Sequence, residues 1–216
     1  MKILVVSSKY YPEYSGSGFR AHKTYKRLEG KYSINYDVVS SSLEQTGVQS
    51  FIYEDANVTR IAGIIKPFKY KGIMQKVVVW INFPFEVFRC WLYIRPKLNT
   101  YDFVHTFGHS RAIGSLTWYL AKHNKSALRE LCNDVPSPYY PKRFQGIMKS
   151  IFNSKKSMVV AISPMLEKMA KQHLVKNIWQ RPNPVEINKF SLELKEKKYL
   201  LRKKITHFDD KDIVLA

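Results

Sequence analysis

The chain has 216 residues, of which 45% are hydrophobic and 14% aromatic, so it can bury a core and falls outside the composition of disordered chains. Its 36 Lys and Arg against 17 Asp and Glu give a net charge of +19, which favours phosphate-bearing partners without choosing among nucleic acid, nucleotide and anionic lipid. The only cysteines, Cys90 and Cys132, are too few for a disulfide-stapled secreted scaffold and are not spaced as metal ligands, so we expect buried thiols in a reduced compartment.

Apolar runs with strand character recur along the chain with helical patterns between them, which predicts βαβ units and a mostly parallel sheet. In the first half we expect a strand at 2–6, a helix with Ala21, Tyr25 and Leu28 on one face that stops at Gly30, strands at 34–40 and 57–62, a helix at 73–93 broken near Pro84, and a strand at 101–106. In the second half we expect a helix containing Ile113, Leu116 and Leu120, strands at 126–131, 157–162 and 177–181, helices at 142–152 and 193–204, and a helix capped by Ser163 with Pro164 in its first turn.

Neither of the two apolar candidates meets the requirements of a membrane signal. Residues 1–6 are too short for a signal peptide and lack a cleavage region. The segment 73–94 is interrupted by Lys76, Glu86 and Arg89 and contains Pro84, so we expect no transmembrane helix.

The last residues change the expected domain organisation. Residues 212–216 look like the opening strand of a further domain with no partner element after it. We therefore expect one Rossmann-like domain at 1–190, followed at 191–216 by an interdomain helix and the first strand of a second domain.

The loop after the first strand leads into a helix and contains small residues where an anion would bind. Gly16, Ser17 and Gly18 would let a ligand approach the backbone N–H groups at the helix start, and Arg20 follows on the first turn. The fingerprint G-x-G-x-x-G is absent, which argues against a dinucleotide-dependent oxidoreductase. An ordinary flexible loop is the alternative.

Polar residues also follow two later strands. His105 stands at the expected end of one strand and His109 just beyond it, where an imidazole could bind a sugar hydroxyl or transfer a proton. Glu130, Asn133 and Asp134 close the next strand and could face the same cleft. Structural histidines and a plain surface loop are the alternatives for these two groups.

The stretch 181–190 combines rigid prolines with an extended path, which suits a crossover between domains. Pro182, Asn183 and Glu186 are its candidate crossover residues.

Taken in order, these motifs resemble the family 4 glycosyltransferases over essentially the whole chain. The resemblance rests on the opening strand, Tyr11-Pro12 with the Gly16/Gly18 pair, Asp102 to His105, the strand–helix turn at 160–164, and 182–186 with Phe190. Two departures are Ser17 between the glycines and Phe107 where the family often has a second histidine.

This resemblance implies the amino-terminal half of a GT-B fold, an α/β Rossmann-like domain with a mostly parallel sheet flanked by helices. It implies sugar transfer from a nucleotide-sugar donor to a glycan or lipid-linked acceptor, usually with retention, without metal or other cofactor. The acceptor would bind mainly to this half, with His105 and His109 as catalytic candidates and Gly16, Ser17, Gly18, Arg20, Glu130, Asn133 and Asp134 as acceptor or phosphate contacts. The donor would bind mainly to a carboxy-terminal half with a Glu-x7-Glu element, which is not recognisable here, so this chain alone should be inactive.

A basic, aromatic segment suggests where such an enzyme would meet a membrane. Lys66, Lys69, Lys71 and Lys76 precede or begin a stretch that contains Trp80, Phe83, Phe85, Phe88, Trp91 and Tyr93. This composition is typical of a helix lying on anionic lipid and also of a buried helix with a solvated collar. We expect a cytoplasmic protein that meets the inner face of the cell membrane.

A basic nucleic-acid-binding α/β module is the competing interpretation. Its support is the charge of +19 together with many Tyr and Phe for base stacking. The basic residues are spread along the chain and no recognition helix or RNP-like motif occurs, so we expect no nucleic-acid partner.

Overall fold

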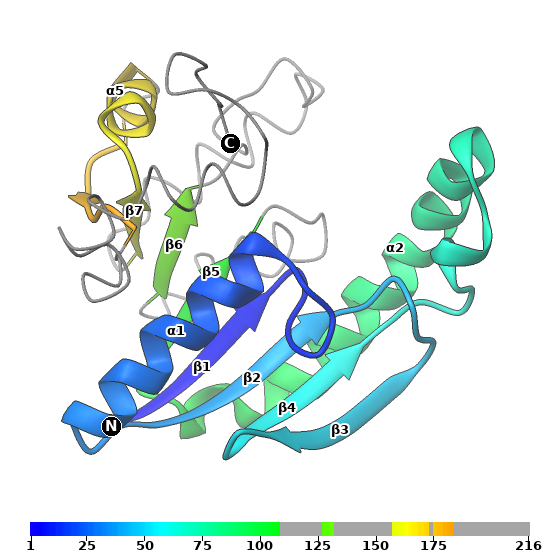
Figure 1. The fold of residues 1–216 in the computed structure, drawn as a ribbon, viewed down its shortest axis with the longest axis horizontal. Helices are drawn as coiled ribbons and strands as arrows, with labels where there is room; N and C mark the ends of the chain where they lie inside the picture. Colours follow the sequence, from blue (N-terminus) through cyan, green and yellow to red (C-terminus); the bar gives the residue numbers. More distant parts are fainter. Residues whose placement is uncertain (109–126, 132–156, 173–174, 184–216) are drawn as a thin grey trace, which may run out of the picture. The chain divides into compact units, whose positions relative to one another are not determined.

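The computed structural model describes residues 1–108, 127–131, 157–172 and 175–183 (Figure 1). Its elements are β1 (Lys2–Ser7), α1 (Gly16–Lys31), β2 (Asn35–Ser41), β3 (Val48–Tyr53), β4 (Ala56–Ile61), the 3₁₀ turn η1 (Pro67–Lys69), α2 (Gly72–Ile94), η2 (Arg95–Thr100), β5 (Phe103–Phe107), β6 (Ala127–Leu131), β7 (Ser157–Ala161), α5 (Pro164–Gln172) and β8 (Ile178–Gln180). Residue contacts divide the chain into a unit Met1–Pro182, which holds all these elements, and a unit Asn183–Ala216.

The strands form one eight-stranded sheet in the order β3-β4-β2-β1-β5-β6-β7-β8. Every neighbouring pair is parallel except β3 and β4, which form an antiparallel hairpin at the edge. The expected α/β class with a mostly parallel, helix-flanked sheet is confirmed.

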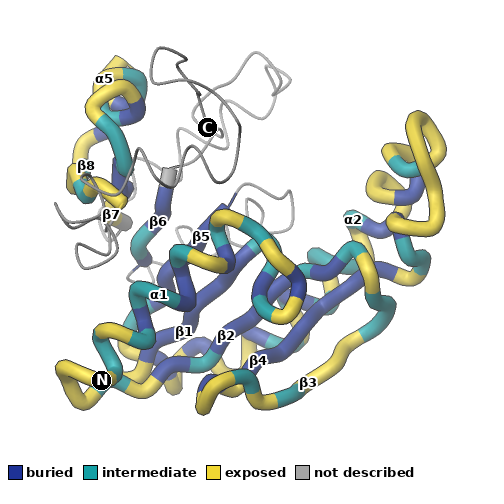
Figure 2. The backbone as a smooth tube through the Cα atoms, viewed as in Figure 1, coloured by how far each residue is buried: buried dark blue, intermediate teal, exposed yellow. Residues whose placement is uncertain are grey.

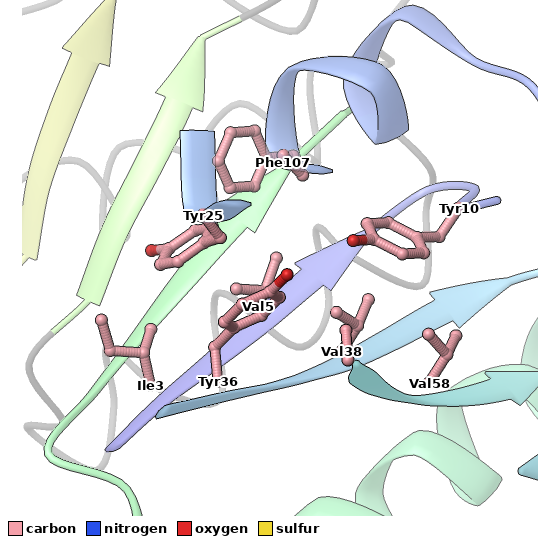
Figure 3. Packing of buried hydrophobic residues seen from close by; sticks show 10 residues of the cluster. Ile3, Val5, Tyr10, Tyr25, Tyr36, Val38, Val58 and Phe107 are labelled. Carbon is pink, nitrogen blue, oxygen red and sulfur yellow. The ribbon is translucent and has the colours of Figure 1, made fainter. Parts of the chain in front are cut away.

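The two faces of β1 serve two separate cores, because side chains alternate along a strand. Ile3 and Val5 pack under α1 with Tyr25 (Figure 3). Leu4 and Val6 pack on the opposite face, in the core that α2 covers. Helices therefore lie on both sides of the sheet, α1 on one face and α2 on the other (Figure 1).

The start of α5 follows the expected capping pattern. Ser163 precedes the helix, and its hydroxyl accepts a hydrogen bond from the backbone N–H of Leu166 at 3.3 Å. Pro164 occupies the first helical position, where its missing N–H costs nothing.

The sequence predicts no element between the strands at 34–40 and 57–62, so it misses strand β3. It is an edge strand, so its residues are mostly exposed and show no apolar run. Its hairpin turn uses Glu54 and Asp55, both with positive φ, in place of the Asn-Gly pair that usually identifies such a turn.

The expected break of the helix near Pro84 is wrong. Helix α2 continues through Pro84 from Gly72 to Ile94. Hydrogen bonds of Asn82 and Arg89, on either side of the proline, tie the helix to the backbone of residues 62–65, which compensates for the one bond that proline removes.

The segment Gly72–Thr100 is long and apolar enough to cross a membrane, judged by length and composition alone. From the sequence we expected no such helix. The helices expected at 113–120, 142–152 and 193–204, the strand at 212–216, the domain boundary at 190 and Cys132 lie outside the described residues. Cys90 is a buried free thiol, as expected.

Candidate functional site

The order of the strands reverses between β1 and β5. Strands β2 and β4 lie on one side of β1, and β5, β6, β7 and β8 follow on the other. In open parallel sheets the loops after two such strands lead apart and leave a crevice at their carboxyl ends, where ligands bind. Here the crevice would begin after Ser7 of β1 and Phe107 of β5, which are register partners. The candidate site is therefore the loop 8–15 after β1 together with the beginning of the loop after β5.

A buried ion pair holds the loop 8–15 in place. Arg60 of β4 donates through Nη2 to the carbonyl oxygens of Tyr11 at 3.1 Å and Tyr10 at 3.4 Å. Its Nε lies 3.7 Å from Oε1 of Glu13, and the Ser42 hydroxyl donates to the same carboxylate. Arg60 and Glu13 are both buried. The loop is thus anchored to the sheet by several polar contacts rather than left free.

Small residues allow this loop to touch the start of α1. Ser15 caps the helix, its Oγ accepting from the backbone N–H of Gly18 at 2.9 Å. The hydroxyl of Ser17 lies 2.8 Å from that of Ser8. A Cβ on Gly18 would meet the carbonyl oxygen of Lys9 at 2.5 Å, so no larger residue fits there without movement.

The loop after β5 joins the same contact through Gly108. This residue has φ +87, a conformation that favours glycine, and a Cβ on it would lie 2.3 Å from Ser8 Oγ. Three segments therefore meet at the switch point: the loop 8–15, the first turn of α1 and Gly108. We call them the switch-point loops. The positive end of α1 and the serine hydroxyls suit an anionic or hydroxyl-rich ligand.

Next to these loops lies a buried polar cluster around Glu130 of β6, which is fully buried. Arg20 of α1 lies 3.1 Å from its Oε2, and Arg181, just after β8, forms an ion pair with its Oε1. His105 Nε2 lies 3.6 Å from Oε1, and its Nδ1 lies 2.8 Å from the Tyr25 hydroxyl. We call these five residues the Glu130 cluster. It ties helix α1 to β5, β6 and the chain after β8.

At Glu130 and at His105, burial and the neighbouring charges shift the pKa in opposite directions, and a different effect dominates at each residue. Burial acts to raise the pKa of Glu130, but His105, Arg181 and Arg20 outweigh it and the pKa lies below its usual value. Burial lowers the pKa of His105 despite the neighbouring carboxylate. At neutral pH the cluster therefore holds an anionic Glu130 and a neutral His105.

The structure corrects the position of His105. The sequence placed it at the end of its strand, whereas β5 continues to Phe107 and leaves His105 in the strand, 3% exposed. Its imidazole is enclosed by Tyr25 and Glu130, and the catalytic role of His105 stays a prediction.

The other predicted residues fall into four groups. Gly16, Ser17 and Gly18 lie at the first turn of α1, in the switch-point loops. Arg20 and Glu130 meet each other, although they are 110 positions apart in the chain. Pro182 and Asn183 end the described part of the chain, whereas His109, Asn133, Asp134 and Glu186 lie outside it.

Sequence reasoning missed Gly108, Ser8, Arg60 and Arg181. A glycine directly after a predicted strand was the only available signal for Gly108. The other three are identified only by contacts across the sheet. Among the described residues, no group of three or more His, Cys, Asp or Glu is arranged to hold a metal ion.

No family model matches this chain, and no curated protein does. Solved structures do match. One is described as "Trehalose-6-phosphate from E. coli bound with UDP-2-fluoro glucose", with a TM-score of 0.54 and 11% identity. Another is described as "Trehalose-6-phosphate synthase. OtsA", with a TM-score of 0.52 and 11% identity. Each match covers 94% of this chain and 55% of the other, so the chain spans about half the length of these neighbours. At this identity the likeness shows the fold, the Rossmann-like α/β half of a GT-B architecture.

Proposed function

We propose that this chain is the acceptor-side half of a GT-B glycosyltransferase of the family 4 type. The observation that carries the proposal is the set of switch-point loops, close-packed through small residues at the carboxyl edge of a GT-B-like sheet. One neighbour holds UDP-2-fluoro glucose, a nucleotide sugar, which supports a donor of this class. A glycan or lipid-linked acceptor would occupy the switch-point loops.

In the proposed reaction the bond between the anomeric carbon and the nucleotide phosphate breaks, and a bond to an acceptor hydroxyl forms. The nucleotide leaves with the bonding electrons, and its phosphate takes up the proton that the acceptor hydroxyl gives up. We expect retention at the anomeric carbon. The described chain would hold the acceptor against the first turn of α1, whose positive end favours an anionic group on it.

The Glu130 cluster would keep this arrangement rigid rather than take part in the chemistry. Its carboxylate links Arg20 on α1 to Arg181 beyond β8. Removing one partner of a buried charge pair leaves the other uncompensated, which disturbs the whole region. The donor would bind mainly to a second half, so this chain alone should have no transferase activity. A cytoplasmic setting fits the buried free thiol of Cys90.

The proposal is tested by ligand binding to the switch-point loops. Glucose 6-phosphate, glucose and inorganic phosphate are titrated into the ¹⁵N-labelled chain, and the amide shifts of Gly16, Ser17, Gly18 and Gly108 are followed. We expect the sugar phosphate to shift these amides at lower concentration than phosphate or glucose alone. The variant Ser17→Val should weaken binding, whereas Thr24→Val, on the same helix but outside the loops, should not.

Two results would count against the acceptor-side proposal. One is unchanged shifts at the switch-point loops with every probe. The other is tight, salt-sensitive binding of a random single-stranded oligonucleotide with no response to the sugar phosphate, which favours a nucleic-acid-binding module.

A further inference from the structure

Helix α2 exposes one apolar face to solvent, although it belongs to a folded domain. Large apolar side chains on it are exposed at the helical spacing i, i+4, i+7, i+8 and i+15 from residue 73: Ile73, Val77, Trp80, Ile81 and Phe88. Ile73 is 78% exposed, and only 22% of the most apolar window of the helix is buried. A core helix of a soluble protein would be mostly buried. Figure 2 shows many exposed residues, drawn in yellow, along the end of α2 that extends beyond the sheet.

The apolar face continues onto the segment that precedes the helix. Phe68 of η1 is 60% exposed, and Ile64 and Tyr70 on either side are exposed as well. Helix α2 and η1 are in contact. The exposed apolar surface is therefore built by two elements, and we call it the α2 face.

Most charges around the α2 face are positive, and Glu86 is the one acidic residue of α2. Residues 56–85 contain no Asp or Glu, whereas Lys69, Lys71 and Lys76 are exposed in this stretch. An apolar face bordered by cations complements a surface that is apolar beneath and anionic on top, which describes an anionic lipid bilayer. A second copy of the chain would bring the same cations together and would be repelled.

The hydrogen bonds of α2 to the domain exclude a spanning orientation in this fold. Asn82 is buried, accepts from the backbone N–H groups of Ile64 at 2.9 Å and Ile65 at 3.1 Å, and donates to the Ile65 carbonyl at 2.6 Å. Arg89 donates to the Gly63 carbonyl at 2.9 Å. A helix that left the domain to cross a bilayer would carry these side chains into lipid and leave the backbone groups without partners.

We infer that the α2 face docks on an anionic membrane with the helix lying in the plane of the interface. Its apolar side chains enter the boundary between headgroups and acyl chains, and the lysines contact lipid phosphates. The domain keeps its internal contacts through Asn82 and Arg89.

Docking in this way brings the switch-point loops close to the lipid surface. The Lys9 ammonium lies over the Phe68 ring, 5.7 Å from its centroid. The backbone N–H of Phe68 donates to the Leu43 carbonyl at 3.3 Å, and the N–H of Leu43 donates to Glu13 at 3.4 Å. Resting on the proposed function, this continuity favours a lipid-linked acceptor over a soluble one.

The docking is tested with the intact chain and sucrose-loaded vesicles of phosphatidylcholine, with and without 30 mol% phosphatidylglycerol. We expect sedimentation with the anionic vesicles at low salt, release as salt screens the lysines, and a blue shift of Trp fluorescence on binding. The double variant Trp80→Ser/Phe88→Ser should lose at least about tenfold in affinity. Lys69→Gln/Lys71→Gln should lose roughly fivefold per charge on anionic vesicles only.

The control is Ile52→Ser/Met165→Ser, which removes two exposed apolar side chains from β3 and α5, outside the α2 face. It should bind like the parent chain. Equal binding by the parent chain and the Trp80/Phe88 variant, or no binding to any vesicle, would overturn the inference. A dimer in sedimentation velocity that the Trp80/Phe88 variant abolishes would instead assign the face to a second copy. None of these readouts requires sugar transfer, so a failure here leaves the acceptor-side proposal standing.

Discussion

Two glycines of α1 provide a sharp test of the close packing at the switch point. Replacing Gly by Ala inside a helix usually stabilises a protein by roughly 0.5–1 kcal/mol, because glycine loses more backbone freedom on folding. Gly30 is exposed and a Cβ added to it would meet nothing within 4 Å, so Gly30→Ala should show that gain. At Gly18 the new Cβ would lie 2.5 Å from the Lys9 carbonyl oxygen. This oxygen cannot easily move away, because Arg60 anchors the loop 8–15 to the sheet.

Overpacking of this kind costs about 1–3 kcal/mol. Both substitutions gain helix propensity, so Gly18→Ala should be less stable than Gly30→Ala by the overpacking cost alone, about 1–3 kcal/mol. Urea unfolding followed by circular dichroism measures both variants against the parent chain. Equal stabilisation by the two substitutions would refute the close approach of the loop to the helix start, and with it the geometry of the candidate site.

Three further substitutions test the other contacts. Glu130→Gln should lower the free energy of unfolding by about 3–5 kcal/mol in urea titrations, because its two half-buried arginine partners lose their counter-charge; a change below about 1 kcal/mol would contradict the cluster. Burial raises the pKa of Glu86 to about 7. As pH rises, the folded chain therefore keeps this proton at pH values where the unfolded chain has already lost it. The stability from this group is present below about pH 4.5 and lost as pH rises through about 7. Glu86→Gln should accordingly match the parent chain at pH 4.5 and exceed it by roughly 1–3 kcal/mol at pH 8, and a pH-independent difference would disprove the raised pKa. Asn82→Ala should cost about 1–3 kcal/mol in thermal unfolding, since it removes a buried side chain that partners two backbone N–H groups and one carbonyl; a neutral result would show that α2 is not held there.

The elements predicted well are those whose signal is local. The apolar run of β1 and the Ser163-Pro164 start of α5 need no knowledge of the rest of the chain. Edge strand β3 was missed because its register is determined by pairing with β4 rather than by its own pattern. The helix through Pro84 was mispredicted because the compensating contact of Asn82 comes from a loop about 17 residues earlier.

The candidate site was predicted only in part for the same reason. The small residues before and within α1 stand out in the sequence, since a glycine and serine cluster at a helix start has a direct physical use. The meeting of Arg20, Glu130 and Arg181 depends on the order of β1, β5, β6, β7 and β8 in the sheet, which no local pattern contains. The burial of His105 likewise follows from α1 covering β5, where Tyr25 packs against it.

The most direct test of the acceptor-side proposal is a transfer assay with two proteins. One is this 216-residue chain, and the other, called the extended protein, is this chain joined to the donor-binding half that the proposal requires. Both are incubated with radiolabelled nucleotide sugars and with membranes from the source cells, and label in the glycan and lipid fractions is measured. We expect the extended protein to incorporate label into one of these fractions and this chain alone to incorporate none. Turnover by the 216-residue chain, or no incorporation by the extended protein with any nucleotide sugar, would contradict the proposal.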